Sequence, residues 1–295
     1  MIKKNRSDKN IILKKRKSLT AGAAVKSGCA LADVQSERDL REMDIDKVGV
    51  SGLSYPVCVL DRNNEKQNTV ATVSMYVDLP KHFRGTHMSR FVEILSEYRG
   101  LITMHNIDKI LKRMIKKFDA TSAHFQMNFN YFIEKSAPVS GVKSMMSYEC
   151  EFIGNYSAAD GYDFVLGVKT PVNTLCPCSK EISPGAGAHN QRSFIDIHVR
   201  FKKLAWIEDI AAVAEGAASA PVFALLKRPD EKYITELAYT NPRFVEDVVR
   251  NVAKAFMEDK NITWFTVEAE NYESIHAHNA YAIIKRDKRR QPAPK

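Results

Sequence analysis

Residues 175–193 concentrate side chains that commonly bind metal ions. Cys176 and Cys178 lie one residue apart, and His189 follows after a short loop that contains two glycines. Thiolate sulfur and imidazole nitrogen are ligands that zinc prefers, and the glycines let the chain turn back toward the cysteines. Because Cys-Pro-Cys differs from the usual Cys-x-x-Cys clip, the stretch fits a functional metal site, a structural zinc knuckle or two ordinary thiols.

Basic residues here and in a second loop suit an anionic ligand. Lys180 and Arg192 flank the loop that precedes His189. Residues 84–90 join an expected strand to an expected helix. They combine a glycine, two hydroxyls, Arg90 and the free N–H groups of a helix start, which together can bind phosphate. The loop is not a P-loop, because the Gly-x-x-x-x-Gly-Lys spacing is absent.

Two further stretches carry groups that could act as ligands, acids or bases. His276 and His278 lie between two expected strands and point to the same side if the backbone is extended. Glu231, in an expected loop, could be an oxygen ligand or a base, and Glu246 lies near the start of an expected helix. Each also fits a surface role: exposed histidines, a solvated carboxylate, or an ion pair with the arginine four residues after Glu246.

The net charge of +9 belongs to the ends of the 295-residue chain. Residues 1–30 hold nine Lys/Arg and one Asp, residues 285–295 hold six and one, and residues 31–284 have a net charge of −4. The N-terminal stretch could contact nucleic acid or anionic lipid, but we expect a solvated, disordered tail. It does not match a secretory signal, because Lys26 interrupts a short apolar stretch.

The composition is that of a soluble chain with room for one large domain or two modules. Hydrophobic residues make up 44% and charged residues 27%, and no run of about 18 apolar residues could span a membrane. The five cysteines, an odd number, argue against a disulfide framework. We therefore expect a protein of the reducing cytoplasm.

Hydrophobic periodicity predicts the elements that position these groups. Alternating apolar and polar residues indicate half-buried strands, and apolar residues at helical spacing from Ile107 to Phe118 indicate a helix. The first half reads as two strands, two helices and two strands, at 49–60, 71–79, 89–98, 107–118, 125–133 and 143–155.

The second half shows the same order of elements without sequence identity to the first, and the boundary is expected near residues 156–161. Its second helix is expected to begin at Asn241-Pro242, with asparagine as the N-cap and proline in the first turn. Residues 227–232 read as a loop. The elements are expected at 162–172, 193–202, 206–218, from 241, 262–270 and 280–285.

Six motifs between about Ala32 and Ile284 occur in the order of a known family. They are Gly85-Thr-His-Met-Ser-Arg-Phe91, Ala137-Pro-Val-Ser-Gly141, Cys176-Pro-Cys-Ser-Lys-Glu-Ile-Ser183, Gly187-Ala-His-Asn-Gln-Arg-Ser193, Leu226-Lys-Arg-Pro-Asp-Glu-Lys232 and Glu273-Ser-Ile-His276. Together they resemble the GTP cyclohydrolase type IB family.

The resemblance implies an α+β protein with the tunnelling fold: two tandem ββααββ modules with antiparallel sheets and helices packed on one face. It also implies a homotetramer with active sites at subunit interfaces. The corresponding division of the chain is a basic tail at 1–31, modules at 32–156 and 157–285, and a second basic tail at 286–295.

The resemblance further implies a set of site residues. One divalent metal ion per site would be held by Cys176, His189, Glu231 and His276. Zinc is the expected ion, with manganese or iron as alternatives, and no organic cofactor is expected. Glu246 would anchor the guanine edge. The chemistry of the reaction makes Cys176, Cys178 and His278 catalytic candidates, with His276 as an alternative for the proton transfers. Lys180, Arg192, Arg90 and His87 would contact the triphosphate.

The implied activity is hydrolysis of GTP at guanine C8. Formate is released and 7,8-dihydroneopterin triphosphate is formed, the first step of tetrahydrofolate biosynthesis. A cyclic phosphate product, as made by archaeal relatives, stays open.

Two other readings use the same residues. A nitrile reductase of 7-deazaguanine metabolism on the same fold would need a nucleophilic cysteine and NADPH but no metal, and Glu231 with the second histidine loop argues against it. A non-catalytic nucleic-acid-binding protein with a structural zinc would depend on the basic tail, so removal of residues 1–30 would separate it from an enzyme. We expect GTP as substrate, and neither nucleic acid nor membrane as partner.

Overall fold

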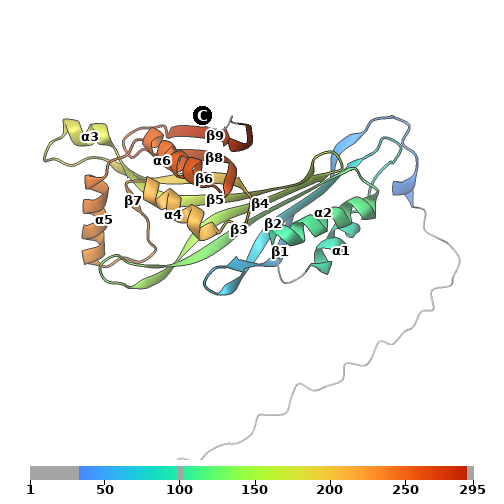
Figure 1. The fold of residues 1–295 in the computed structure, drawn as a ribbon, viewed down its shortest axis with the longest axis horizontal. Coiled ribbons are helices and arrows are strands. Elements are labelled where there is room, and N and C mark those ends of the chain that lie inside the picture. Colours follow the sequence, from blue (N-terminus) through green and yellow to red (C-terminus); the bar gives the residue numbers. More distant parts are fainter. Residues whose placement is uncertain (1–32, 99–101, 291–295) are drawn as a thin grey trace, which may run out of the picture. The chain divides into compact units, whose positions relative to one another are not determined.

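The computed structural model describes residues 33–98 and 102–290. Within these residues one nine-stranded antiparallel sheet runs in the order β1-β2-β3-β4-β5-β6-β8-β9, with the short β7 paired to β5 (Figure 1). The predicted tail at 1–31 lies outside the described residues. The strands are β1 (Ile45–Asp61), β2 (Glu65–Leu79), β3 (Ser122–Ser136), β4 (Lys143–Ser157), β5 (Gly161–Leu175), β6 (Asn190–Phe201), β7 (Ala220–Pro221), β8 (Ile262–Asn271) and β9 (Ala280–Asp287).

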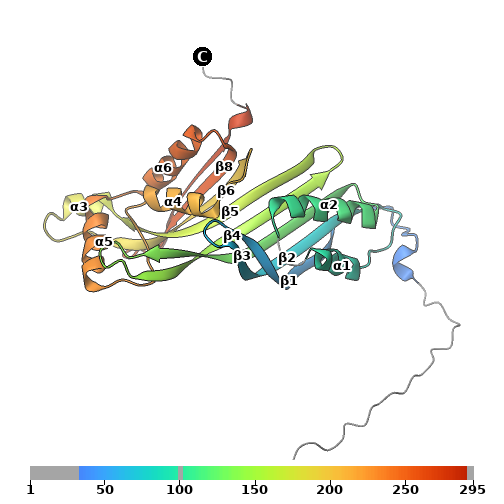
Figure 2. The ribbon, with the colours of Figure 1, turned by 60° about the horizontal axis from the view of Figure 1, so that its bottom comes forward.

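Four helices cover one face of this sheet. Helices α1 (Ser89–Glu97) and α2 (Met104–Phe118) lie over the first strands, and α4 (Ile207–Ala217) and α6 (Val245–Glu258) lie over the last ones (Figure 2). Burial alternates along the strands, as the period-2 pattern predicts: on β3, Phe125 and Met127 are buried and Gln126 is exposed. The expected α+β arrangement with helices on one face is confirmed.

Two additional helices, α3 (Pro177–Ile182) and α5 (Arg228–Thr240), interrupt the expected order of the second half. The prediction that residues 227–232 form a loop is therefore wrong. Proline lies in the first turn of α5, and the Asp230 carboxylate accepts the backbone N–H of Lys227 at 2.9 Å. Both features favour a helix start, which a loop reading of these polar residues overlooks.

Helix α6 begins at Val245, four residues later than predicted from Asn241-Pro242. Asn241 instead ends α5, and its side-chain amide donates to the carbonyl oxygens of Ala218 and Ser219 at 3.0 and 3.2 Å. A local sequence pattern cannot reveal this long-range contact. Because of it, the Asn-Pro pair lies in the connection between two helices and not at a helix start.

The predicted boundary at 156–161 is a hairpin turn, since β4 and β5 pair directly with Tyr156 opposite Tyr162. Tyr131 and Tyr148 on β3 and β4 also donate hydroxyl hydrogen bonds to Glu208 and Glu215 of α4, at 2.7 and 2.6 Å. These bonds fix a helix of the second half to strands of the first. The two predicted modules describe an order of elements that occurs twice in the chain. Whether they are separate domains stays a prediction.

The predicted C-terminal tail at 286–295 begins within β9, and residues 291–295 lie outside the described residues. A 3-10 turn, η2 (Lys288–Arg290), follows the strand. The Lys288 ammonium donates to the Phe256 carbonyl at 2.8 Å, which holds this turn against the end of α6. Across the described part of the chain, no helix has the length and apolar character needed to cross a membrane.

Candidate metal centre and its surroundings

Cys176 and His189 meet where two neighbouring strands end. Leu175 at the end of β5 pairs with Asn190 at the start of β6, and the Cys176 N–H donates to the His189 carbonyl at 3.1 Å. Cys176 is the N-cap of α3, and its Sγ accepts the Ser179 N–H at 3.4 Å. The backbones of Cys176 and His189 are thus brought together by strand pairing.

The histidine loop reaches the same place through the next strand. Strand β8 pairs with β6, and the Tyr272 N–H donates to the Arg192 carbonyl at 3.0 Å. The His276 ring lies edge-on to His189 with centroids 6.2 Å apart and stacks on His278 at 5.2 Å. One thiol-bearing turn and three imidazoles therefore lie at one end of the sheet.

Glu273 adds a carboxylate that the predicted ligand set omits. Its Oε2 lies 3.7 Å from His189 Nδ1, and each of the two side chains is only 11% exposed. The sequence contained a clue to this role of Glu273, because it is the first residue of the Glu-Ser-Ile-His276 motif and lies three residues before a predicted ligand.

Among the described residues, Glu231, the predicted oxygen ligand, forms no hydrogen bond or ion pair with this cluster. It is exposed in the first turn of α5, whereas α3 contacts the far end of that helix, where Lys180 Nζ donates to the Tyr239 carbonyl at 2.6 Å. The eight residues from Glu231 to Tyr239 span about 12 Å of helix. Among the described residues no three His, Cys, Asp or Glu side chains are arranged to hold a metal ion.

Asp230, beside Glu231, clamps two of the family-like motifs together. Its carboxylate accepts the N–H groups of Val139 and Ser140, both at 2.8 Å, and the Ser140 hydroxyl at 2.7 Å. Burial would raise the pKa of Asp230, but these hydrogen bonds and that from Lys227 outweigh it and lower the pKa. The β3–β4 turn is therefore fixed to the start of α5.

We expect Asp230→Ala to lower the free energy of unfolding by about 3 kcal/mol, because it removes a buried carboxylate that accepts from three backbone N–H groups and one hydroxyl. Urea unfolding at pH 7 measures the loss. Asp160→Ala is the matched control, since Asp160 is exposed and accepts from Ser157 in a surface turn. Equal losses in the two variants would contradict this account of the clamp.

A hollow of 420 Å³ adjoins the His189 loop, with Arg192 at its edge. Its lining includes residues of α5 and residues between 221 and 226. Lys180, predicted to contact triphosphate, lies over the Tyr239 ring at 4.5 Å as well as donating to its carbonyl. Cys178 is exposed on α3.

The remaining predicted substrate residues lie on other helices. Glu246 is exposed in the first turn of α6, and the Arg243 N–H just before that helix donates to the Leu175 carbonyl at 3.0 Å. The start of α6 is thus next to the Cys176 strand end. Arg250 pairs with Asp247 at 3.9 Å, not with Glu246. Arg90 and His87 lie at the start of α1, which both views place at the opposite end of the sheet from α3 (Figures 1 and 2).

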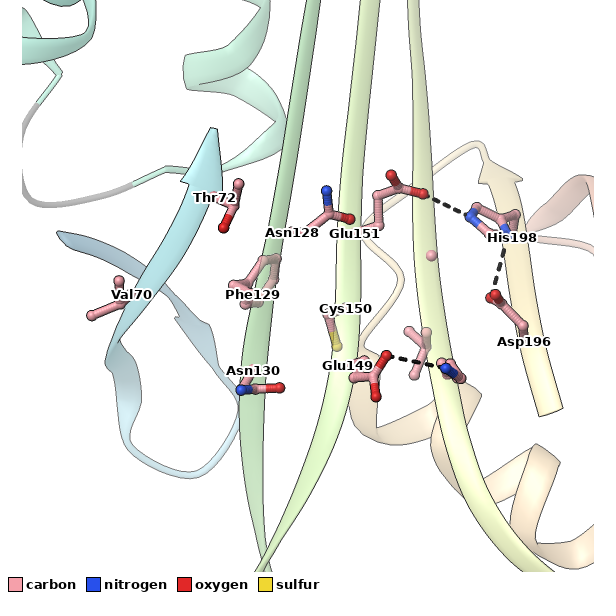
Figure 3. Close-up of a pocket in the computed structure, with 13 residues that line it drawn as sticks. Val70, Thr72, Asn128, Phe129, Asn130, Glu149, Cys150, Glu151, Asp196 and His198 are labelled. Carbon is pink, nitrogen blue, oxygen red and sulfur yellow. Dashed lines mark hydrogen bonds and ion pairs between the residues drawn. The ribbon is translucent and has the colours of Figure 1, made fainter. Parts of the chain in front are cut away.

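A second hollow lies on the sheet face that carries no helices (Figure 3). There His198 Nε2 lies 2.9 Å from Glu151 Oε2, and His198 Nδ1 lies 3.5 Å from Asp196. A side chain at Gly167 would reach within 2.8 Å of His198 Nε2, so glycine is needed for the imidazole to cross from β6 to β4. The hydrogen bond with Glu151 raises the pKa of His198, and the bond with His198 lowers the pKa of Glu151.

This pair predicts a pH-dependent contribution to stability. The raised His198 pKa stabilises the fold below the unfolded value of about 6.5 and loses that effect as pH rises through the folded pKa. The lowered Glu151 pKa acts above about 4.3 and is lost in acid. Glu151→Gln should therefore cost about 1.5–3 kcal/mol near pH 6 and clearly less at pH 9. Urea unfolding at both pH values measures this, and an equal loss at both would contradict it.

The continuous antiparallel sheet, with helices on one face and the Cys–His cluster at one end, defines a tunnelling-fold protein with a candidate metal centre. Urate oxidase from Bacillus sp. TB-90 has a similar fold, with a TM-score of 0.50 and 9% identity over 83% of this chain and 100% of that chain. A hyperthermostable mutant of the same urate oxidase gives the same TM-score and identity over 84% and 100%. At this identity the likeness concerns the fold alone.

Sequence comparison is more specific. The family described as type I GTP cyclohydrolase FolE2 matches residues 31–282. GTP cyclohydrolase FolE2 of Geotalea uraniireducens is 55% identical over 259 residues, covering 88% of this chain and 94% of the relative. That of Geobacter sulfurreducens is 55% identical over 260 residues, covering 88% and 100%. The chain belongs to the type I GTP cyclohydrolase FolE2 family.

Proposed function

We propose that this protein is a GTP cyclohydrolase. It hydrolyses GTP at guanine C8, releases formate and forms 7,8-dihydroneopterin triphosphate, the first step of tetrahydrofolate biosynthesis. Family membership over residues 31–282 carries this proposal, and the proximity of Cys176 to His189 and of His189 to His276 within that range supports it.

We propose that Cys176, His189 and His276 hold one divalent ion, with Glu231 as a further donor. Thiolate and imidazole suit zinc, and imidazole also suits iron, whereas manganese would favour more oxygen donors. When bound, the ion would lower the pKa of water enough for attack on a purine carbon at neutral pH. Glu273, held against His189, is the carboxylate available to the cluster within the same chain.

The other residues of the cluster are placed to move protons. Ring opening and the later rearrangement of the ribose carbons both need proton transfers, and such groups must lie within hydrogen-bond reach of the substrate. His278, stacked on His276, and Cys178, exposed on α3, are the groups we assign to these transfers. Cys176 could serve as ligand and as acid or base, because a thiolate can do both.

Substrate binding is assigned by the chemistry of GTP. The Glu246 carboxylate would accept from guanine N1–H and the exocyclic amine, and Arg192 at the edge of the 420 Å³ hollow would face phosphate. Lys180 donates to Tyr239 in this structure and would keep two further N–H donors for an anion.

We propose a homotetramer with interface active sites. Arg90 and His87, at the far end of the sheet from α3, could contact the same triphosphate only if they come from another subunit. Strands β1 and β9 end the sheet order of the described residues, and such edges are suited to strand pairing with a second copy. The use of GTP and the free thiols of Cys58, Cys150, Cys176 and Cys178 support a cytoplasmic location.

Incubation of the metal-loaded protein with GTP tests this function. We expect equimolar formate and a pterin that becomes fluorescent on oxidation, and mass analysis should show three phosphates. A cyclic phosphate product would show that the enzyme has a variant of this activity. Absence of formate together with NADPH-dependent reduction of a 7-deazaguanine nitrile would overturn the assignment.

A further inference from the structure

His189 is held by a buried polar network that reaches back into the sheet. Gln191, 6% exposed, places Oε1 3.1 Å from His189 Nδ1 and Nε2 3.0 Å from Thr174 Oγ1. The same Nε2 lies 3.4 Å from Glu273 Oε1. Thr174 Oγ1 lies 2.7 Å from Ser193 Oγ, and both side chains are buried.

The partners of Gln191 fix which way its amide points. A carboxylate accepts hydrogen bonds and cannot donate, so the amide nitrogen must face Glu273. The amide oxygen then faces His189, and because it can only accept, His189 Nδ1 must carry the hydrogen. In a neutral imidazole this leaves the lone pair on Nε2, the nitrogen that is free to bind a metal.

We propose that Gln191 is a positioning residue that fixes the Nδ1–H tautomer of His189 and turns its Nε2 toward the site; this rests on the proposed metal centre. The network consists of this chain's own side chains, so it orients the ligand through protein contacts alone. Metal-binding histidines gain orientation and basicity from such partners. Through its other end Gln191 also holds Glu273, so one amide sets the direction of two groups.

Thr174 and Gln191 hold this network in a fixed position because both belong to paired strands. Thr174 and Gln191 are opposite each other on β5 and β6. Ile195 and Ile197 continue the buried side of β6 with apolar residues, whereas Gln191 and Ser193 are polar at equivalent positions. Buried polar groups at core positions favour a single arrangement only when they are fully hydrogen-bonded, and here they orient a residue of the adjacent loop.

Nitrogen NMR of the metal-free protein tests the proposal directly. With ¹⁵N-labelled histidine, His189 of the wild type should show the Nδ1–H tautomer. Its signals are assigned by their loss in His189→Gln. Gln191→Leu should convert His189 to the Nε2–H form and weaken zinc binding by about 10- to 100-fold, measured by chelator competition. Gln191→Glu, which still accepts from Nδ1–H, should retain the tautomer.

Gln67→Leu is the matched control. Gln67 also bonds through both ends of its amide, to Asp61 and to the Phe132 backbone, in a hairpin that contributes no proposed site residue. Its loss should lower the melting temperature but leave the His189 tautomer and zinc affinity unchanged. An Nε2–H His189 in the wild type, or an unchanged tautomer in Gln191→Leu, would overturn the proposal. A wild type with the Nδ1–H tautomer but no GTP turnover would refute the proposed function alone.

Discussion

Cys176→Ala is expected to abolish GTP turnover. It should also weaken metal binding more than the loss of a residue that only holds a ligand in place, which typically costs about 10- to 100-fold in affinity. The reason is that Cys176 supplies the sulfur donor and lies where the β5 and β6 strand ends meet, whereas its neighbour is exposed on α3. Formate release and chelator competition, measured on the same preparations, give both effects.

Cys178→Ala provides the comparison within the same turn. We expect it to retain metal and to lose only part of its turnover, because Cys178 is assigned to proton transfer and not to the ion. Equal loss of metal in the two variants would contradict this assignment and favour a Cys-Pro-Cys clip.

Mixing two inactive variants is expected to restore activity if Glu231 acts across a subunit interface. Glu231 is exposed in the first turn of α5, and among the described residues it forms no group with Cys176 and His189 that could hold a metal ion. When Cys176→Ala and Glu231→Ala subunits are denatured together and refolded, random assembly should complete about a quarter of the sites. Turnover per site in the mixture measures this recovery.

The control for mixing is a pair of variants from the same cluster. Cys176 and His189 lie together in one chain, so Cys176→Ala mixed with His189→Ala should stay inactive. If neither mixture recovers although both refold as oligomers, Glu231 does not act in trans. Glu273 would then be the preferred carboxylate donor.

The sequence predicted the sheet well because its strands are half-buried. Alternation along β2 and β3 follows directly from burial of one face, and the helical spacing from Ile107 to Phe118 corresponds to the buried stripe of α2. Helix α5 was missed because its start is polar and reads as a loop. The start of α6 was misplaced because Asn241 is used by carbonyls far away in sequence.

The candidate site was predictable only in part. Strand pairing brings Cys176, His189 and His276 to one end of the sheet, and their role as metal ligands stays a prediction. No local pattern could reveal where Glu231 lies relative to them, since that depends on how α5 is docked. Gln191 could have been noticed as a polar residue that continues the buried side of β6, but its partners Thr174 and Glu273 required the fold.

Anomalous X-ray diffraction at the zinc edge, from crystals of the zinc-loaded protein, tests the metal centre most directly. We predict one strong peak per chain, bonded to Cys176 Sγ at about 2.3 Å and to His189 and His276 at about 2.0–2.1 Å. A peak bound by Cys176 and Cys178 together, or one located at Glu151 and His198 with none near His189, would contradict the account.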